Sequence, residues 1–544
     1  MEPSQGVRIL SLQLNHFKIR DKERKAIVVG DRLKEFLRNT ALDRTDKIHS
    51  PVPSYQIFTK KIIDSFVENL EQKRLFSQIC DLYDKREYSL VRQILEANLP
   101  RKAKQNESSN IETRLYHLKM MIDTLWNLDD YEECIGWVEI TLHETKLQMQ
   151  TKNAASESLE LTAKQYMDLL TSLECCLCMF EKENDYSSIE EPFRARLANN
   201  LLDLCLEQVE GKEEILDGCK TTLPWVLLYK LIAFEEQQPN NSQSDTVPGS
   251  ISFICSAHDY LGQLSMCTRD DGRLLLLQSD AIVSTLFKGV KDRAMADQLR
   301  KNLDQAMYCL YAHPSKKSKL KHLVDHSVPN IALRWDRCMS PYQYLRPEKL
   351  PEYDDFKSNS ILSETVLFFK RIVALIPEQF NLQGRNRSVK EYLTSGPDFD
   401  FPKFSKIPQK DRPLLDVLYL LADYYFKNNE FTTALEYYRY DLCFNQDRVD
   451  SWFPLALSLV NVLEQKLNET YKDPASGKVL ELCDDLIGRI MVDSDVIMKC
   501  YARCHLLSPK NSMICIESAN FAYTMHSFCT RQLDILSESA SWFI

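Results

Sequence analysis

The fold is decided by LLDVLYLLADYYFKNNEFTTALEYYRYDLCFNQDRVDSWFPLA, which spans residues 414–456. Apolar and small residues recur at spacings of three and four on both sides of the polar turn KNNE, a pattern typical of two amphipathic helices joined by a short loop. The positions that carry this pattern are Leu418, Leu421, Ala422, Tyr425, Phe431, Ala434 and Tyr438. The opening of the pattern recurs after 34 residues, at Trp452, Leu455 and Ala456.

A repeat of this length with these offsets resembles a tetratricopeptide repeat (TPR), which is a helical hairpin. Small residues let the two helices approach where they cross. We therefore expect Ala434 to face Ala422 at the crossing, Tyr425 and Tyr438 to cover it, and Lys427 to lie on the exposed turn. TPR hairpins bind other proteins and carry out no chemistry, so the pattern predicts a binding surface.

Other parts of the chain follow the same hairpin pattern less regularly. Leu82, Tyr88, Val91 and Leu95 share the offsets of the hairpin described above, and so do Leu125, Tyr131, Cys134 and Val138. Further helices are predicted over 161–180, 194–209 and 223–236. The best hairpin itself departs from the TPR consensus at Asp441, where a small residue is usual, and at Gln446, where proline is usual.

Composition favours an all-α protein. Only 13 of the 544 residues are glycine, about a third of the roughly 7% average, whereas sandwiches and doubly wound folds need more turn glycines. A hydrophobic content of 44% and a charged content of 27% are ordinary for a folded protein. The net charge of −10 argues against a nucleic-acid-binding body, because such a surface needs clustered Lys and Arg.

The cysteines and the start of the chain bear on the cellular compartment. Most of the 17 cysteines lie inside apolar helical stretches, which is typical of reduced, intracellular proteins. The sequence MEPSQGVRIL is not a signal peptide, and no apolar run approaches the roughly 18 residues that a membrane helix needs. We therefore expect no membrane association.

We divide the chain into three helical regions: an N-terminal TPR-like region over 1–236, a middle region over 251–382, and TPR repeats over 410–544. The polar, proline-bearing segment 237–250 is the clearest linker, and 383–412 is a second loose stretch. The helical pattern continues to the last residue without a capping signal, so we expect the last repeat to be truncated and the chain to be either a fragment or a natural short form. The predicted fold class is all-α, an irregular α-solenoid of TPR-like helical hairpins.

The middle region combines helices near 251–263, 272–288 and 293–312 with a proline-punctuated strap, YQYLRPEKLPEYDDF, over 342–356. We predict that the strap is not helical, because its prolines force the preceding residues into extended or turn backbone. Its aromatic residues are Tyr342, Tyr344, Tyr353 and Phe356. Two interpretations stay open: a strap that binds a partner, or a connector fixed along the array by its aromatic side chains.

No catalytic, cofactor-binding or metal-binding signature is found. The chain lacks phosphate-binding glycine loops, a nucleophile elbow and a paired-histidine zinc motif. Cys175-Cys176-Leu177-Cys178 lacks the second pair of ligands that a closed zinc site needs, so these residues are interpreted as core thiols. Cys255-Ser256-Ala257-His258 has no evident partners and is interpreted as packed helix. We expect no enzyme, no cofactor and no metal.

The basic stretch SKKSKLKH, residues 315–322, has two interpretations. It is either a solvated turn, or a contact for phosphate, for an acidic partner or for the nuclear import machinery.

Several segments outside the TPR pattern resemble the calcineurin-binding protein cabin-1 family and its fungal counterpart in the histone regulatory complex. They are CLYAHPSKKSKLKHLVDHS, LRPEKLPEYDDFKS, LYLLADYYFKNNEFTTALEYYRYDLC and ANFAYTMHSFCTRQL, in that order along the chain. The resemblance covers most of residues 75–540 and corresponds to a central part of the longer family members. It implies a nuclear scaffold that pairs with the WD-repeat protein HIRA and with ubinuclein in replication-independent deposition of histones.

From this resemblance we expect a non-enzymatic scaffold subunit of a HIRA-type histone chaperone complex, with histones held indirectly and no direct contact to nucleic acid. The alternatives are a calcineurin-binding inhibitor and transcriptional co-repressor, or a generic TPR adaptor. PNIALR, residues 329–334, fits a loose calcineurin-docking pattern of the PxIxIT type. Such a motif must be exposed so that it can add as a strand to its partner, and this one runs into a predicted helix.

Overall fold

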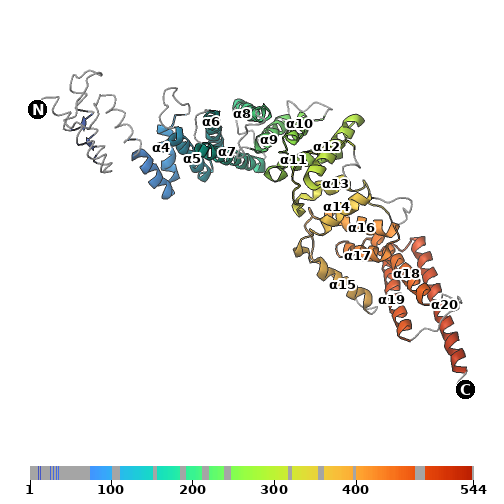
Figure 1. Ribbon diagram of the computed structural model, residues 1–544. Helices are drawn as coiled ribbons and strands as arrows, with labels where there is room; N and C mark the ends of the chain where they lie inside the picture. Colours follow the sequence, from blue (N-terminus) through green and yellow to red (C-terminus); the bar gives the residue numbers. More distant parts are fainter. Residues whose placement is uncertain are drawn as a thin grey trace, which may run out of the picture. The chain divides into compact units, whose positions relative to one another are not determined.

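The protein is all-α in the computed structural model, and the prediction of helical hairpins is confirmed (Figure 1). The structure describes residues 74–100, 111–150, 156–183, 191–210, 220–237, 247–315, 321–352, 361–395, 400–471 and 484–541, with a few isolated positions before residue 74. These ranges contain helices and no strand. Two compact units divide the chain, Met1–Lys220 and Thr221–Ile544.

The first unit is a stack of helices in chain order, beginning with the helical residues 74–84. Its further helices are α4 (Tyr88–Asn98), α5 (Ile111–Asn127), α6 (Tyr131–Gln150), α7 (Ser156–Glu183) and α8 (Glu191–Glu210). Helix α4 packs on α5, α5 on α6, and α6 on α7. The interior includes Val91, Leu95, Leu125, Cys134 and Val138, all buried, as the hairpin pattern predicts.

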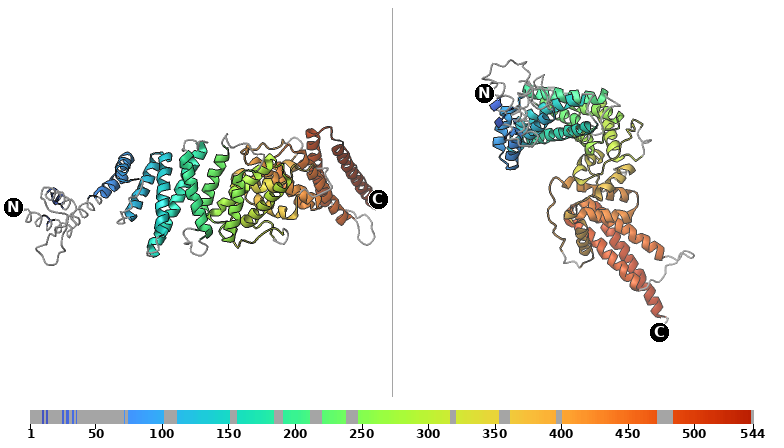
Figure 2. Two further views of the ribbon diagram at one scale, coloured as in Figure 1. Left: turned by 90° about the horizontal axis from the view of Figure 1, so that it is seen from above. Right: turned by 60° about the vertical axis from the view of Figure 1, so that its left-hand side comes forward.

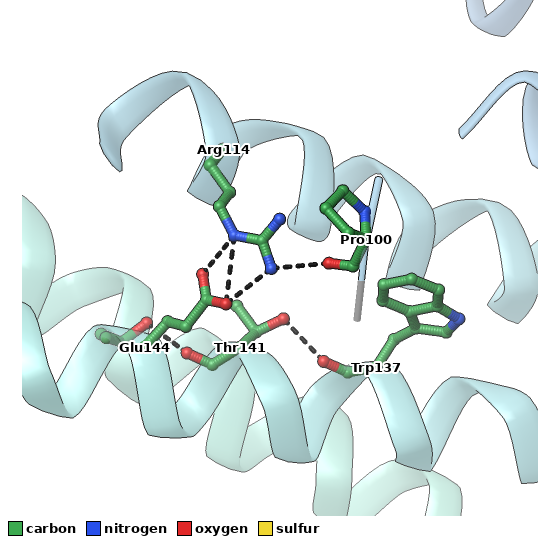
Figure 3. A network of polar contacts seen from close by, with 6 residues as sticks. Pro100, Arg114, Trp137, Thr141 and Glu144 are labelled. Atoms are coloured by element: carbon green, nitrogen blue, oxygen red, sulfur yellow. Dashed lines mark hydrogen bonds and ion pairs between the residues drawn. The ribbon is translucent and has the colours of Figure 1, made fainter. Parts of the chain in front are cut away.

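One polar staple in this unit fixes α5 against α6 (Figure 3). The guanidinium of Arg114 on α5 donates to Glu144 on α6, with Nη2 to Oε1 at 2.7 Å and Nε to Oε2 at 2.8 Å. Its Nη2 also donates to the carbonyl of Pro100, 2.9 Å away. Because both charged side chains are largely buried and the contact is bidentate, this pair holds a defined geometry and is not a loose surface contact.

The second unit is also built of stacked helices, with more irregular elements between them, and its helices can be followed by colour in both views of Figure 2. Its helices are α9 (Leu223–Gln237), α10 (Gly249–Gln263), α11 (Arg273–Lys288), α12 (Arg293–Tyr311), α13 (Met339–Leu345), α14 (Ser363–Val373), α15 (Leu382–Thr394), α16 (Asp416–Lys427), α17 (Phe431–Leu442), α18 (Val449–Tyr471), α19 (Asp484–Leu507) and α20 (Ser512–Ser541). Consecutive helices pack together from α9 to α12 and from α16 to α20.

The predicted linker 237–250 does not coincide with the division between the units. Helix α9, which the sequence assigned to the N-terminal region, packs on α10 and α11 and belongs to the second unit. Residues 238–246 of the linker lie outside the described ranges, and its last two residues open α10. A polar segment therefore separates two helices of one core, because both flanking helices carry apolar faces that pack against each other.

Helices α16 and α17 form the predicted TPR hairpin. Ala422 and Ala434 are completely buried, and Tyr425 and Tyr438 are buried beside them. Trp452, in the next helix, is also completely buried, in agreement with the 34-residue period. The expectation for Lys427 is wrong: its side chain is only 5% exposed, and its Nζ lies 3.1 Å from a carboxylate oxygen of Asp423, one helical turn earlier.

The two departures from the TPR consensus are explained by one polar network below the hairpin. Asp441 is fully buried and accepts from the hydroxyl of Ser451 at 2.6 Å, from Nη1 of Arg448 at 2.9 Å and from the amide of Asn445 at 2.8 Å. The indole of Trp452 donates to the carbonyl of Gln446 at 2.8 Å. Hydrogen bonds among these polar groups thus hold the turn between α17 and α18. The TPR consensus has a small residue and a proline at the corresponding positions.

Two sequence predictions are wrong in detail. The strap begins as helix, because Tyr342–Leu345 complete α13 and the chain becomes extended only at Arg346, before the first proline. Within the loose stretch 383–412, α15 forms instead. Its buried side chains Val389, Tyr392 and Leu393 give it an apolar face, and the Asn381 side chain caps its first turn. This helix has few apolar positions, and they lie among a glycine and three basic residues. Its sequence therefore shows only a weak helical periodicity of apolar residues.

Aromatic side chains hold both the helical start of the strap and its extended end. Tyr342 is completely buried, and the hydroxyl of Tyr344 donates to Asp304 on α12 at 2.6 Å. The hydroxyl of Tyr419, on α16, donates to the carbonyl of Pro351. These contacts favour the interpretation as a fixed connector. Tyr353 and Phe356 lie outside the described residues.

Candidate metal centre

Two histidines and two cysteines meet in the interior of the second unit. His258 lies on α10, Cys267 in the loop that follows it, Cys309 on α12, and His326 in the extended segment 321–334. All four side chains are buried, and one donor atom from each lies within 4.8 Å of the donor atoms of the other three. This arrangement gathers four soft or borderline donors from four separate elements.

The spacing of the donor atoms matches a tetrahedral site. Nδ1 of His326 is 3.4 Å from Sγ of Cys309 and 3.6 Å from Sγ of Cys267. Zinc binds sulfur at about 2.3 Å and imidazole nitrogen at about 2.0–2.1 Å, so the edges of such a tetrahedron measure roughly 3.3–3.8 Å. The rings of His258 and His326 are nearly perpendicular, with their centroids 5.2 Å apart.

The electrostatics of the cluster also suit a cation. Nε2 of His258 is completely buried, and no group in the described residues satisfies it with a hydrogen bond. A hydrogen bond with Cys267 and the nearby imidazoles of His258 and His326 lower the pKa of the Cys309 thiol. The same thiol contact, together with burial, raises the pKa of Cys267. The lowered pKa favours the thiolate of Cys309, which is the form in which cysteine binds metals.

The loop that carries Cys267 is fixed in an unusual backbone conformation. Ser265, Asp270 and Asp271 all have positive φ angles, between 53° and 58°, which non-glycine residues rarely adopt. The loop is held in place by side chains: Thr222 donates to Asp270 from its backbone N–H at 2.6 Å and from its hydroxyl at 2.8 Å. Arg337 Nη2 donates to Asp271 Oδ2 at 2.5 Å. Neighbouring elements therefore hold Cys267 in position.

The segment that carries His326 is attached to α12. Gln305 makes two hydrogen bonds of 2.8 Å with the backbone of Val324, one as donor and one as acceptor, in the manner of a strand neighbour. Its Nε2 also lies 3.3 Å from Sγ of Cys309, so one amide contacts both a candidate ligand and the segment that carries another. Farther along, the N–H of Ile331 donates to the carbonyl of Leu310 at 2.8 Å.

A glycine makes room for the His326 ring. Gly262 lies on α10 one turn after His258, and a Cβ at this position would come within 2.2–2.6 Å of three atoms of the imidazole. Atoms never approach so closely, so any side chain at this position would displace the ring. Helix α10 therefore contributes both a candidate ligand and the space for the second histidine.

The expectation that His258 has no partners is wrong. Its partners come from distant parts of the chain: His326 is 17 residues from Cys309 and 59 from Cys267, and neither interval belongs to a ligand motif. Cys255, the other chemically active residue of the CxxH pattern, is not in the cluster; its sulfur accepts from Gln278 at 3.6 Å. The only indication of the cluster in the sequence is that each of its four residues lies in or beside an apolar stretch.

The other candidates from the sequence are not brought together into a site. The prediction of core thiols is confirmed for Cys176, which is buried in α7 with its sulfur 3.6 Å from that of Cys134. It is wrong for Cys175, which is exposed on the same helix, while Cys178 is half-buried. Lys316, Lys317 and Lys319 lie outside the described residues. The calcineurin-like segment PNIALR packs against α12: Asn330 donates to the carbonyl of Cys309 at 2.9 Å, and Leu333 is buried.

Chemically, the four donors fill all positions of a tetrahedral ion. A catalytic zinc site keeps one position open for water or substrate, whereas a structural site is closed by four protein ligands. The buried cluster of His258, Cys267, Cys309 and His326 is therefore of the structural type.

Within the described ranges, no helix is long and apolar enough to span a membrane.

The comparisons with known proteins add little to these findings. No protein-family model matches the sequence. A solved structure described as a circular tandem repeat protein with novel repeat topology and enhanced subunit contact surfaces is similar to this chain with a TM-score of 0.21 and 11% sequence identity. The similarity covers 99% of this chain and 98% of that one.

Proposed function

We propose that this protein is a scaffold subunit of a HIRA-type histone chaperone complex in the nucleus, and that it acts through protein–protein contacts without catalysis. In this proposal it holds a HIRA-like WD-repeat protein and a ubinuclein-like subunit, and histones contact it only through them. The support is twofold: the resemblance of its sequence segments to the cabin-1 family, and a stack of helical hairpins, an architecture that builds extended binding surfaces.

The observation that carries the binding role is an exposed apolar face on α20. On α20, Ile514, Phe521 and Met525 are buried. The other side of this helix carries Ile516, which is 54% exposed, and Tyr523, which is 75% exposed, seven residues later and thus on the same face. Large apolar side chains gathered on one exposed face are typical of protein interaction sites.

A binding experiment with purified components tests the proposal. We expect the immobilised chain to capture the HIRA-like WD-repeat protein and the ubinuclein-like subunit, and to capture histones H3–H4 only when these are present. The double variant Ile516→Asp, Tyr523→Asp should lower the capture at least tenfold. Leu362→Asp is the matched control, because Leu362 is 77% exposed but lies elsewhere, just before α14.

Three outcomes would contradict the proposal. Capture of neither subunit at micromolar concentration would remove its basis. Capture of calcineurin without the WD-repeat protein would favour the phosphatase regulator instead. Equal loss of capture in Leu362→Asp would mean that α20 is not the binding face.

A further inference from the structure

We propose that His258, Cys267, Cys309 and His326 bind one structural Zn²⁺ ion, which ties the loop after α10 and the segment 321–334 to α10 and α12. The proposal is independent of the proposed function. It rests on four buried side chains whose donor atoms lie within 4.8 Å of one another, and on S–N distances of 3.4 and 3.6 Å that equal the edges of a zinc tetrahedron.

The donor set selects the ion. Two thiolates with two imidazoles suit Zn²⁺ in tetrahedral geometry, whereas Mg²⁺ and Ca²⁺ require oxygen ligands. A carboxylate is not part of the cluster. Two thiolates balance the charge of Zn²⁺, so the bound group is neutral and suits a buried position, where an uncompensated charge is costly.

The surroundings behave as a shell that positions the ligands. Gln305 donates to the sulfur of Cys309 at 3.3 Å while both of its amide atoms bind the backbone of Val324, two residues before His326. Gly262 leaves the space that the His326 ring occupies. Second partners of this kind orient metal ligands in other proteins, and their loss weakens metal binding about 10- to 100-fold.

An ion at this position also gives the segment 321–334 a reason to be ordered. The segment has no helix or strand of its own, and so few backbone hydrogen bonds hold it. Its attachments to α12 include the hydrogen bonds of Gln305 with Val324, that of Ile331 with Leu310 and that of the Asn330 side chain with the carbonyl of Cys309. An ion bound by both His326 and Cys309 would attach the segment to α12 at a further place, close to the hydrogen bonds between Gln305 and Val324. Because a ligand set of this kind forms only in the folded chain, metal binding adds to folding stability.

The first test is the metal content of the 544-residue chain purified from zinc-supplemented cells without chelators. We expect about one zinc ion per chain by mass spectrometry of the elements. Cys267→Ser and Cys309→Ser should each lose most of this zinc. Cys255→Ser is the matched control, because Cys255 is a buried cysteine on α10 outside the cluster, and it should keep the zinc.

The second test separates lost binding from lost folding. Co²⁺ should replace Zn²⁺ and give the visible absorption of tetrahedral cobalt together with sulfur-to-cobalt charge transfer. His258→Cys retains four ligands, so it should keep the metal with stronger sulfur bands, whereas His258→Leu should lose it. Gly262→Ala should weaken cobalt binding at least tenfold, while Gly488→Ala, a helical glycine with open space around it, should not.

The proposal is overturned by any of three results. One is a wild-type chain that contains no zinc and does not take up Zn²⁺ or Co²⁺ after reduction. Another is retention of the metal in both cysteine variants. The third is a disulfide between Cys267 and Cys309 in the chain as purified under reducing conditions, found by peptide mapping, because a disulfide cannot ligate the ion as two thiolates.

Discussion

The TPR hairpin of α16 and α17 and the cluster region around α10 and α12 belong to the same unit but are stabilised differently. In the hairpin, Ala422, Ala434 and Tyr438 come from adjacent helices and pack as a continuous apolar interior. In the cluster region, His258 and His326 come from segments far apart in sequence and meet through polar and sulfur contacts.

This difference predicts which kind of substitution destabilises each region. Apolar packing between neighbouring helices fails when a side chain changes volume, because interiors are close-packed and leave no spare space. A cluster of polar groups fails when one member is removed, because its partners then stay buried without a hydrogen bond or a ligand. We therefore expect volume changes to damage the hairpin and single polar deletions to damage the cluster region.

The largest expected effect is that of Ala434→Arg in the hairpin. The arginine would overfill the helix crossing and bury an unpaired charge, so we expect a loss of about 4 kcal/mol or more in the free energy of unfolding. Urea denaturation followed by circular dichroism measures it. Thr432→Arg is the control, because Thr432 is exposed on the same helix and its substitution should change stability by less than about 0.5 kcal/mol. Equal losses in the two variants would mean that Ala434 is not at the crossing.

The second-largest expected effect is an exception to this contrast, because the hairpin also depends on one buried polar group, the carboxylate of Asp441. Asp441→Ala would remove one of the two carboxylates that Arg448 contacts in the described residues and would leave Asp416, at 2.5 Å, as the other. We expect a loss of about 3 kcal/mol, as for other buried pairs from which one partner is removed. The control Asp447→Ala removes an equally charged residue that is 69% exposed and pairs with Arg503 at 2.9 Å, and it should cost about 0–1 kcal/mol. Similar losses in the two variants would contradict a structural role of the buried network.

The hairpin could be predicted from the sequence because its information is local. Ala422, Tyr425 and Ala434 stand at fixed intervals, and the same intervals decide which side chains face the interior. The predicted burial of all three is confirmed. The environment of Lys427 could not be predicted, because a turn position says nothing of how a long side chain folds back toward an acidic residue one turn earlier.

The cluster could not be predicted from the sequence for a matching reason. Which histidine meets which cysteine depends on how α10 and α12 pack and on the path of segment 321–334, and no interval in the sequence records either. From the sequence, we interpret the CxxH of Cys255 and His258 as packed helix without partners, but the fold brings Cys267 and Cys309 to this histidine. Helix α15 was missed for a related reason, since a small apolar face leaves a weak periodic signal.

A third effect tests the cluster region through acid. Burial lowers the pKa of His313, at the end of α12, to about 4. The unfolded chain therefore binds a proton that the folded chain does not between about pH 6.5 and pH 4, so stability is lost as the pH falls through this window. From about pH 7 to about pH 5 this histidine should remove about 2 kcal/mol.

The variant His313→Phe isolates this contribution. Phenylalanine keeps an apolar ring beside Phe368, whose ring centroid is 5.0 Å from that of His313, but it cannot bind a proton. We expect the stability difference between about pH 7 and about pH 5, measured by urea denaturation, to shrink by about 2 kcal/mol in the variant. Release of metal from the cluster at low pH would affect wild type and variant alike and so cancels. An unchanged difference would show that His313 is solvated.

The smallest expected effect concerns the two attachments of segment 321–334. One is made by Gln305 to the backbone of Val324, and the other is made through His326. Gln305→Leu removes the two hydrogen bonds to Val324, each 2.8 Å long, while the rest of the segment keeps its other contacts. The loss should be about 1–2 kcal/mol, since the backbone groups of Val324 are only partly buried and water replaces part of what is lost. In the metal-free protein the loss stays at this value, whereas in the zinc-loaded protein it should be larger by about 1–3 kcal/mol, because Gln305 also contacts Cys309 and its removal weakens metal binding about 10- to 100-fold. Gln298→Leu, on the exposed side of α12, is the control, with a single side-chain contact to Asn302 at 3.1 Å. A loss that is the same with and without zinc would mean that the two attachments act independently.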